Sequence, residues 1–250
     1  MTPLILIPAR MAATRLPGKP LADIGGLPMI VRVLRAAEAA EAGPVAVAAG
    51  DREIAEAVTA AGGRALLSDP DLPSGSDRIM AALRELDPQG ACEAVVNLQG
   101  DMPFLQPEAV AACAALLADE PACDISTVVA PEASPADRDN ADVVKAVCAF
   151  PEGAEPGACG RALYFTRSRL YGDGPVWRHV GLYGYRRTAL ERFTTAPPSP
   201  LERREKLEQL RALELGLSIW AAAVAEAPLS VDTPADLAAA RAYALSLALS

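Results

Sequence analysis

Residues 4–21 read L-I-L-I-P-A-R-M-A-A-T-R-L-P-G-K-P-L. The apolar residues 4–7 predict a buried strand, and the prolines and the glycine behind them stop the backbone from continuing as a helix. The strand must therefore give way to a stiff loop, which carries the cations Arg10, Arg15 and Lys19. Open α/β sheets bind phosphates in such loops, at the carboxyl end of the first parallel strand. The stretch predicts an anion-binding loop, and the plainer alternative is a solvated basic loop.

The residues that follow alternate between short apolar runs and alanine-rich segments with helical spacing. Strands are expected at residues 45–48, 65–67 and 94–98, and helices at 29–42, 53–61, 77–86 and 107–118. This alternation predicts a parallel sheet with right-handed crossovers, buried on both faces, whose ligand site lies at the carboxyl ends of the strands.

A different pattern begins at residue 124. Strand-like runs at 125–130, 143–150, 161–166 and 181–186 are separated by polar loops, which favours an antiparallel insertion that would act as a lid or a dimer contact. The α/β character returns with a helix over about 200–215, a strand at 218–224 and a last helix opened by Thr233 and Pro234. We expect one domain in three parts, residues 1–123, 124–199 and 200–250.

Composition argues against several functions. The net charge is −9 and the isoelectric point about 4.8, so the chain lacks the broad positive field that binding to nucleic acid or an anionic membrane surface requires. The five cysteines form no C-x-x-C pair and only one histidine is present, which leaves little for a structural zinc site or a Ser-His triad. The amino terminus and residues 219–225 fit neither a signal peptide nor a membrane span. We expect a cytoplasmic protein, in which any metal is held by carboxylates.

Two aspartates stand where strands are predicted to end. Asp101 follows the strand 94–98 in V-V-N-L-Q-G-D-M-P, and Asp232 lies in S-V-D-T-P-A-D-L, between a strand and a capped helix. If both side chains face one crevice, they would share a Mg²⁺ ion, because magnesium takes one or two carboxylates and completes its shell with water and substrate phosphates. The alternative for Asp232 is a plain helix cap.

A second polar loop, L-P-S-G-S-D-R at residues 72–78, precedes a predicted helix. Ser74, Gly75 and Arg78 are candidates to line a nucleotide site. The alternative is that serine and aspartate merely cap the helix and that glycine gives the loop its turn.

Seven segments resemble, in order and spacing, those of the 3-deoxy-manno-octulosonate (KDO) cytidylyltransferase family. They are I-P-A-R-M-A-A-T-R-L-P-G-K-P-L, P-S-G-S-D-R, V-N-L-Q-G-D-M-P, R-A-L-Y-F-T-R, H-V-G-L-Y-G-Y-R, P-L-E-R-R-E-K-L-E-Q-L-R and V-D-T-P-A-D-L. The resemblance covers nearly the whole chain. It implies an α/β fold of the three-layer, Rossmann-like nucleotide-diphospho-sugar transferase type, with a mixed, mostly parallel sheet and an antiparallel dimerisation subregion. It also implies a Mg²⁺-dependent homodimer that transfers CMP from CTP to KDO for lipopolysaccharide synthesis.

The resemblance further implies roles for individual residues. The catalytic set would consist of Arg10, Arg15 and Lys19 on the triphosphate, with Asp101 and Asp232 on the magnesium ion. Ser74, Gly75 and Arg78 would lie near the nucleotide. The acidic sugar would contact Gln99, Arg167, His179, Tyr183, Glu208 and Gln209. A guanidinium and a histidine suit a sugar carboxylate, and Glu and Gln suit its hydroxyls. A solvated helix face is the plain alternative for Glu208 and Gln209, and aromatic core packing for Tyr183.

Three alternatives stay open. The first is a nucleotidyltransferase with another acceptor: a KDO variant, another acidic sugar such as sialic acid, or, for a guanylyl- or cytidylyltransferase, a sugar or polyol phosphate. The second is a protein that binds nucleotides without catalysis, and the third is a dimeric scaffold. A dinucleotide binder is disfavoured because G-x-G-x-x-G does not follow the first strand. The sequence departs from the family pattern in four places, namely Ala13, Gly50, the pair Leu72-Pro73 and Met102. None is a predicted cation or metal ligand, but they bear on how cytosine is recognised and on the surroundings of the metal.

Overall fold

The first strand is built from the apolar run near the start of the chain. In the computed structural model, which describes residues 1–12, 15–172 and 174–249, β1 spans Leu4–Ala9 and its Ile5 to Ile7 side chains are fully buried. It pairs in parallel with β4 (Val45–Ala49) along one edge and with β6 (Ala94–Leu98) along the other. A strand with neighbours on both edges and helices on both faces has no exposed side, which explains its continuous apolar sequence.

Contacts divide the chain into two compact units. The N-terminal unit comprises residues 2–110 and 228–250, and the central unit comprises residues 111–227 with Met1. The helix α4 (Pro107–Asp119) carries the chain from the first unit into the second.

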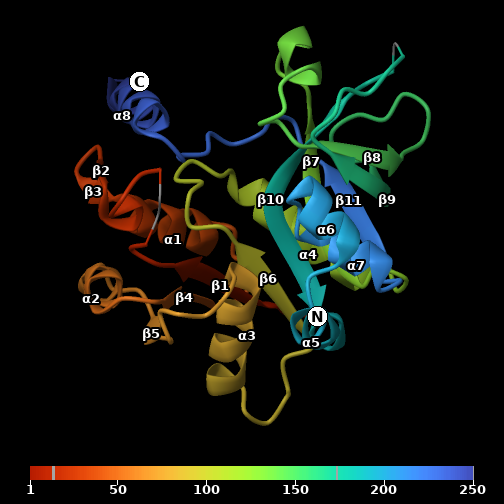
Figure 1. Cartoon of the computed structure of the whole chain (residues 1–250). Coiled ribbons are helices and arrows are strands. Elements are labelled where there is room, and N and C mark those ends of the chain that lie inside the picture. The colour runs from red at the N-terminus through yellow and green to blue at the C-terminus, as the bar shows by residue number, and fades with distance from the viewer. Residues whose placement is uncertain (13–14, 173, 250) are drawn as a thin grey trace. The chain divides into compact units, whose positions relative to one another are not determined.

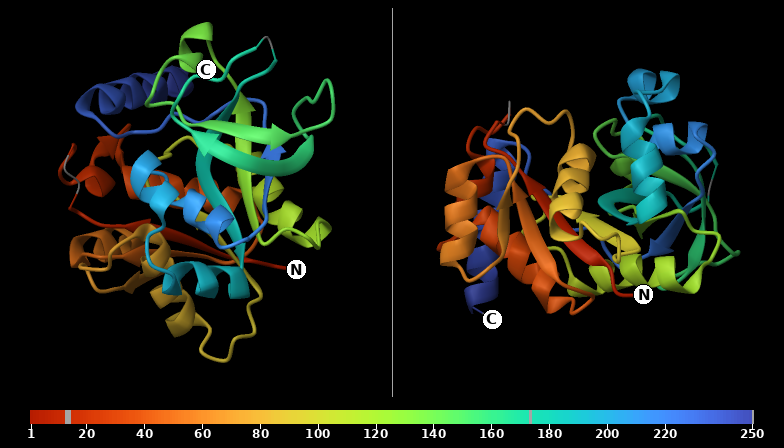
Figure 2. Two further views of the ribbon diagram at one scale, coloured as in Figure 1. Left: turned by 45° about the vertical axis from the view of Figure 1, so that its right-hand side comes forward. Right: turned by 90° about the horizontal axis from the view of Figure 1, so that it is seen from below.

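The N-terminal unit contains four parallel strands in the order β5-β4-β1-β6, where β5 is Ala65–Leu67 (Figure 1). The helices α1 (Met29–Ala39) and α2 (Arg52–Ala60) lie on one face of these strands and α3 (Gly75–Leu86) on the other (Figure 2). The chain first builds β4 and β5 on one side of β1, then crosses to β6 on the opposite side. Such a reversal of strand order opens a crevice at the carboxyl ends of the two central strands, where ligands bind in open α/β sheets.

The smaller elements of the N-terminal unit close this end of the strands. They are the 3₁₀ helix η1 (Lys19–Leu21), the hairpin β2 (Asp23–Ile24) with β3 (Leu27–Pro28), and the helix α8 (Pro234–Leu249). An apolar cluster joins α8 to the hairpin through Ile24, Met29, Val231, Leu237 and Ala240. Segments from the two ends of the chain are thereby packed against each other.

In the described part of the central unit, five strands follow the order β10-β7-β11-β9-β8. Their bounds are β7 Ile125–Pro131, β8 Lys145–Ala149, β9 Cys159–Thr166, β10 Trp177–Arg186 and β11 Ile219–Ala223. β7 and β11 are parallel and the other pairs are antiparallel. β8 also pairs with the start of β10, so that the hydrogen-bonded order closes on itself. The remaining helices are α5 (Arg187–Thr195), α6 (Pro200–Glu205), α7 (Gln209–Glu214) and the 3₁₀ helix η2 (Pro135–Arg138).

Most predicted elements are confirmed within a few residues, and three differ. The single helix expected over 200–215 is wrong: α6 ends at Glu205, the next residue Lys206 has a left-handed φ of 56°, and α7 starts only at Gln209. β10 begins at Trp177, before the predicted residue 181, because its first residues pair with β8. The helix α5 was not predicted. None of the helices described is long and apolar enough to cross a membrane.

Candidate functional site

A cavity of about 350 Å³ lies in the N-terminal unit, at the carboxyl ends of β1 and β6. Its walls come from the loop after β1, from η1, from the loop before α3, from the end of β6 and from Asp232 in the segment that leads into α8. The predicted site residues of this unit all line it: Arg10, Arg15, Lys19, Ser74, Gly75, Arg78, Gln99, Asp101 and Asp232. The reversal of strand order therefore collects side chains from distant parts of the sequence at one point.

The ammonium group of Lys19 lies between the two aspartates. Its Nζ is 3.2 Å from Asp101 Oδ2 and 3.1 Å from Asp232 Oδ1. Arg15 Nη2 lies 3.2 Å from the other oxygen of Asp232. The side chain of Lys19 is only 16% exposed and that of Asp101 only 24%, so solvent screens their ion pair less than a surface pair.

Asp101 is brought to the cavity by a close turn after β6. A Cβ atom at Gly100 would lie 3.1 Å from the carbonyl oxygen of Pro8, so glycine lets the end of β6 approach the end of β1. The backbone oxygen of Asp101 accepts a hydrogen bond of 2.9 Å from the Val231 amide. This bond ties the segment of Asp101 to the segment of Asp232.

Asp232 does not cap α8. The cap is formed by Thr233 and Asp236: the Asp236 amide donates to Thr233 Oγ1, and the Thr233 amide donates to Asp236 Oδ2 over 2.8 Å. The Asp232 amide also donates to Asp236 Oδ2, over 3.1 Å. The carboxylate of Asp232 is thus left to face Lys19 and Arg15, so the helix-cap alternative for its side chain is wrong.

The charge balance at Asp101 favours a cation beside it. Burial raises the pKa of Asp101, the Lys19 ammonium opposes this rise, and the negative charge of Asp232 adds to it. A positive group between the two carboxylates relieves both the desolvation and the repulsion. Within the described residues no group of three or more His, Cys, Asp or Glu side chains is placed to hold a metal ion. A metal at this position would therefore have only these carboxylates as acidic ligands.

The loop before α3 has a structural task as well as a place in the cavity wall. Ser74 is the N-cap of α3 and its Oγ accepts the Asp77 amide over 3.1 Å. The Arg78 guanidinium donates to Ser68 Oγ and to the backbone oxygens of Asp69 and Pro70. Burial lowers the pKa of Arg78, and the nearby Arg10 adds to this. Ser74 is therefore the helix cap that the sequence allowed, and Arg78 mainly orders the 68–70 segment.

Arg10 is engaged differently from Arg78. Its side chain lines the cavity and makes no ion pair or hydrogen bond with another residue that the structure describes.

Of the departures from the family pattern, Leu72 lines the cavity, Met102 is buried and Ala13 lies outside the described residues.

Apart from Gln99, which lines the cavity of the N-terminal unit, the predicted acceptor residues belong to the central unit. His179 and Tyr183 lie on one face of β10, with ring centroids 5.2 Å apart. The pairing of β10 with β7 is shifted between Val180 and Tyr183, so that His179 lies opposite Val129 and Tyr183 opposite Thr127. Because side chains alternate along a strand and these two residues are four positions apart, both rings lie on the same side of the sheet. His179 Nε2 is 3.1 Å from Thr127 Oγ1.

Both of these side chains are neutral near pH 7. Burial lowers the pKa of His179 to about 3. Burial also raises the pKa of Tyr183 well above its usual value, and Tyr185 and Glu208 add to this shift. The pair offers neutral hydrogen-bonding groups and no charge.

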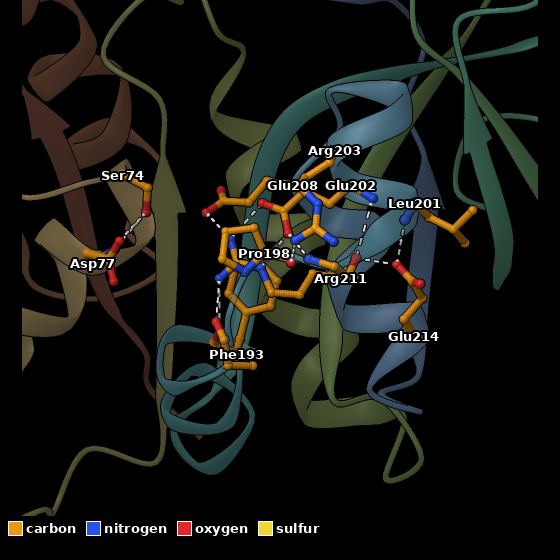
Figure 3. A network of polar contacts seen from close by, with 12 residues as sticks. Ser74, Asp77, Phe193, Pro198, Leu201, Glu202, Arg203, Glu208, Arg211 and Glu214 are labelled. Carbon is orange, nitrogen blue, oxygen red and sulfur yellow. Dashed lines mark hydrogen bonds and ion pairs between the residues drawn. The ribbon is translucent and has the colours of Figure 1, made fainter.

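Glu208 is positioned by a buried arginine, Arg211 (Figure 3). Arg211 donates to both carboxylate oxygens of Glu202 over 2.8 Å, and to Glu208 Oε1 over 3.3 Å. Its guanidinium also lies over the Phe193 ring, 4.5 Å from the centroid. Gln209 is only 7% exposed, and its Nε2 has no hydrogen-bond partner among the described residues. Because buried polar groups are ordinarily hydrogen-bonded, this amide is available to a further partner such as water or a bound ligand.

Arg167 is not joined to His179 or Tyr183 by any contact among the described residues. Its Nη1 donates to the backbone oxygen of Ala141 over 3.0 Å. The fully buried Lys145 holds the same segment, because its Nζ donates to the oxygens of Asn140 and Arg167. Lys145 was not predicted; its place in an apolar strand run gave no sign of this contact.

Comparison with known proteins identifies the family. The cytidylyltransferase family model matches residues 4–219. A 3-deoxy-manno-octulosonate cytidylyltransferase of Parvibaculum lavamentivorans is 57% identical over 96% of this chain and 92% of its own. One from Rhodopseudomonas palustris is 59% identical over 95% and 96%. The chain belongs to the 3-deoxy-manno-octulosonate cytidylyltransferase family. Membership makes it a cytidylyltransferase, and the resemblance stated from the sequence motifs is confirmed.

Solved structures agree with the family membership. A CMP:2-keto-3-deoxy-manno-octonic acid synthetase in complex with CTP has a TM-score of 0.88 and 34% identity, over 99% of this chain and 100% of its own. A nucleotidyl transferase from Methanothermobacter thermautotroptrophicus has a TM-score of 0.63 at 14% identity over 98% of both chains, which concerns the fold alone. The predicted α/β nucleotidyltransferase fold, with parallel and antiparallel strands, is confirmed.

Proposed function

We propose that this cytidylyltransferase transfers CMP from CTP to 3-deoxy-D-manno-octulosonic acid, releasing pyrophosphate, with Mg²⁺ as cofactor. The observation that carries the proposal is the pair Asp101 and Asp232, joined by Lys19 in a cation-lined cavity, in a chain whose relatives bear this activity in their names. The anomeric hydroxyl of the sugar would attack the α-phosphorus of CTP in line. The bond from that phosphorus to the β-phosphate bridging oxygen would break, and the hydroxyl proton would leave to solvent.

Arg10, Arg15 and Lys19 would bind the triphosphate. Arg10 is free for this among the described residues, whereas Arg15 and Lys19 already contact carboxylates. On binding CTP they would exchange these ion pairs for phosphate oxygens, because the triphosphate carries the larger negative charge. They would then stabilise the leaving pyrophosphate.

Asp101 and Asp232 would hold the magnesium ion. Their hard carboxylate oxygens fit Mg²⁺, whose remaining ligands are water and substrate phosphates. When bound, the ion would neutralise charge on the triphosphate and polarise the phosphoryl group under attack. Lys19 would keep the two carboxylates close together until that charge arrives.

The acceptor would be bound by groups of the central unit. The unpaired Nε2 of Gln209 and the Glu208 carboxylate suit sugar hydroxyls, and Tyr183 offers a neutral phenol. His179 would donate a hydrogen bond as a neutral ring, because its pKa of about 3 excludes a charged imidazolium near pH 7. Arg167 would then be the cation for the sugar carboxylate.

Three further expectations belong to this proposal. The family resemblance implies a homodimer, which light scattering after size exclusion would detect as twice the chain mass of 26.0 kDa. The product would supply lipopolysaccharide synthesis. The enzyme would work in the cytoplasm, because that compartment supplies CTP.

The test is pyrophosphate release with CTP, Mg²⁺ and KDO, run beside ATP, GTP and UTP and beside sialic acid and a sugar 1-phosphate. Release that requires CTP and KDO together supports the proposal. Release with another acceptor would overturn the assignment of the sugar, and no release with any pair would overturn catalysis. The Asp101→Asn variant is the inactive control: it should lose turnover and still bind CTP.

A further inference from the structure

Asp51 directly follows Gly50 at the end of β4 and stands at the N-cap position of α2. Its backbone oxygen accepts the first helical hydrogen bond, from the Ala55 amide, but its side chain makes no capping bond. An aspartate at this position ordinarily accepts an amide of the first helical turn. Here Oδ2 instead accepts the Met11 amide over 2.7 Å, forty residues earlier in the chain.

This hydrogen bond extends the pairing of β1 with β4 beyond the end of β1. The last backbone bond at this end runs from the Gly50 amide to the Ala9 oxygen over 2.8 Å. The Asp51 carboxylate supplies the next acceptor, where the chain turns into the cation-bearing loop. The start of that loop is therefore held by a side chain where backbone pairing stops.

Met11 connects this anchor to both ends of the described loop. Its oxygen accepts the Gly18 amide over 3.4 Å. Arg10 precedes Met11 and Lys19 follows Gly18. One carboxylate, acting through Met11, thereby restrains two cations of the cavity.

The negative charge of Asp51 also suits its surroundings, because two arginines lie close to the neighbouring Gly50. Arg10 and Arg78 both approach Gly50: a Cβ atom there would lie 3.2 Å from Arg10 Cβ and 2.9 Å from Arg78 Nη1. The positive charge of Arg10 lowers the pKa of Arg78, and the negative charge of Asp51 raises it. An anion at Asp51 offsets the repulsion between the two arginines without forming an ion pair with Arg10, whose guanidinium stays available.

We propose that Asp51 is a positioning residue for the triphosphate of CTP. Its carboxylate accepts the Met11 amide in place of an amide of α2. This hydrogen bond restrains the backbone that carries Arg10 and Lys19. The inference rests on the proposed function for the identity of the nucleotide, but the acceptor sugar plays no part in it.

The test is direct binding of CTP with Mg²⁺ by isothermal titration calorimetry, without any sugar, to wild type and to Asp51→Ala, Asp51→Asn and Asp87→Ala. Asp87 is the matched control, because its carboxylate accepts the Ala91 and Cys92 amides, the latter also over 2.7 Å, and it does not line the cavity. Loss of a hydrogen bond to a charged group that orders the site should weaken binding by roughly tenfold in Asp51→Ala. Asp51→Asn keeps an acceptor and should stay within about threefold of wild type. Asp87→Ala should bind as wild type does.

Kinetics give the second readout. Asp51→Ala should raise KM for CTP and leave KM for the sugar unchanged. Unchanged CTP affinity in Asp51→Ala, an equal loss in Asp51→Asn, or an equal loss in Asp87→Ala would each overturn the positioning role. If Asp51→Ala does not fold, the comparison of Asp51→Asn with Asp51→Ser decides, because serine is too short to reach Met11. A wild type that binds CTP but releases no pyrophosphate with any sugar would refute the proposed function and leave this result to stand by itself.

Discussion

At the scale of single residues, the cavity is organised around one ammonium group. Lys19 contacts two carboxylates that lie 82 and 213 positions away in the sequence. These contacts hold together two like charges that would otherwise repel. Lys19 therefore serves the ligand-free chain as a counter-charge, in addition to the role proposed for it with the triphosphate.

We predict that Lys19→Met binds divalent metal more tightly than wild type in the absence of nucleotide. Removing the ammonium leaves Asp101 and Asp232 without their shared partner, so a cation meets less competition. The affinity for Mn²⁺, used as a probe, should rise roughly tenfold, within the usual range for one charge near a site. Calorimetry with Mn²⁺ measures it, and Lys206→Met, outside the cavity, is the control. An unchanged affinity would show that Lys19 does not compete with the metal.

His179 leads to a prediction on stability and pH. Its pKa is about 3 in the folded chain and about 6.5 in an unfolded one. Between these values the unfolded state binds more protons, so stability is lost as pH falls below about 6.5, by up to roughly 1.4 kcal/mol per pH unit from this group. The variant His179→Gln should lose less stability than wild type between pH 6.5 and 5. Urea unfolding of both proteins at the two pH values checks this, and equal losses would contradict it.

At the scale of secondary structure elements, capping decides which side chains are free for chemistry. Thr233 and Asp236 cap α8, and so Asp232 faces the cavity. Asp51 stands at the N-cap of α2 but binds Met11 instead. Both aspartates stand just before a helix, and neither side chain caps it. Asp51 accepts the Met11 amide, and Asp232 contacts Lys19 and Arg15 because Thr233 and Asp236 form the cap.

We predict that Thr233→Ala destabilises α8 and disturbs the position of Asp232 relative to Asp101. Loss of a threonine cap costs about 1 kcal/mol of unfolding free energy. Because the Val231 amide and the Asp232 backbone belong to the same segment, kcat should also fall, by a few-fold. Urea unfolding and steady-state kinetics measure the two effects. Thr233→Ser keeps the hydroxyl and should restore both, so a serine variant as impaired as alanine would refute the explanation.

At the scale of the whole molecule, the predicted nucleotide residues and the predicted acceptor residues fall in different compact units, except for the acceptor residue Gln99, which lies in the N-terminal unit. The cations and aspartates line the cavity of the N-terminal unit, and His179, Tyr183, Glu208 and Gln209 belong to the central unit. Each unit builds its groups from its own strands and helices. Ligand binding in the two units can therefore be followed separately.

Amide hydrogen exchange tests this division. CTP with Mg²⁺ should slow exchange in peptides from residues 15–21, 72–78, 99–102 and 230–236, because a ligand stabilises the segments that it contacts against local opening. KDO, added afterwards, should slow exchange in β10 and α7. Protection by CTP restricted to β10 and α7 would contradict the assignment of the cavity to the nucleotide.

Local sequence was enough to predict much of the fold. The run at residues 4–7 gave a buried strand because a parallel strand needs apolar side chains on both faces. Thr233-Pro234 gave a helix start because capping depends on adjacent residues. The break at Lys206 was missed, since a lysine in left-handed backbone is set by the packing of its neighbours and has no local signal of its own.

By itself, the sequence determined the order of the elements of the N-terminal unit, the stiff loop with its three cations and the presence of aspartates after predicted strands, because spacing and residue type encode these directly. Only the tertiary structure decided which charges meet. Lys19 reaches Asp101 and Asp232, Asp51 reaches Met11, and the His179 ring is held neutral. Contacts across many tens of residues and the loss of water around a side chain depend on how the strands are ordered and packed, and no short stretch of sequence contains that information.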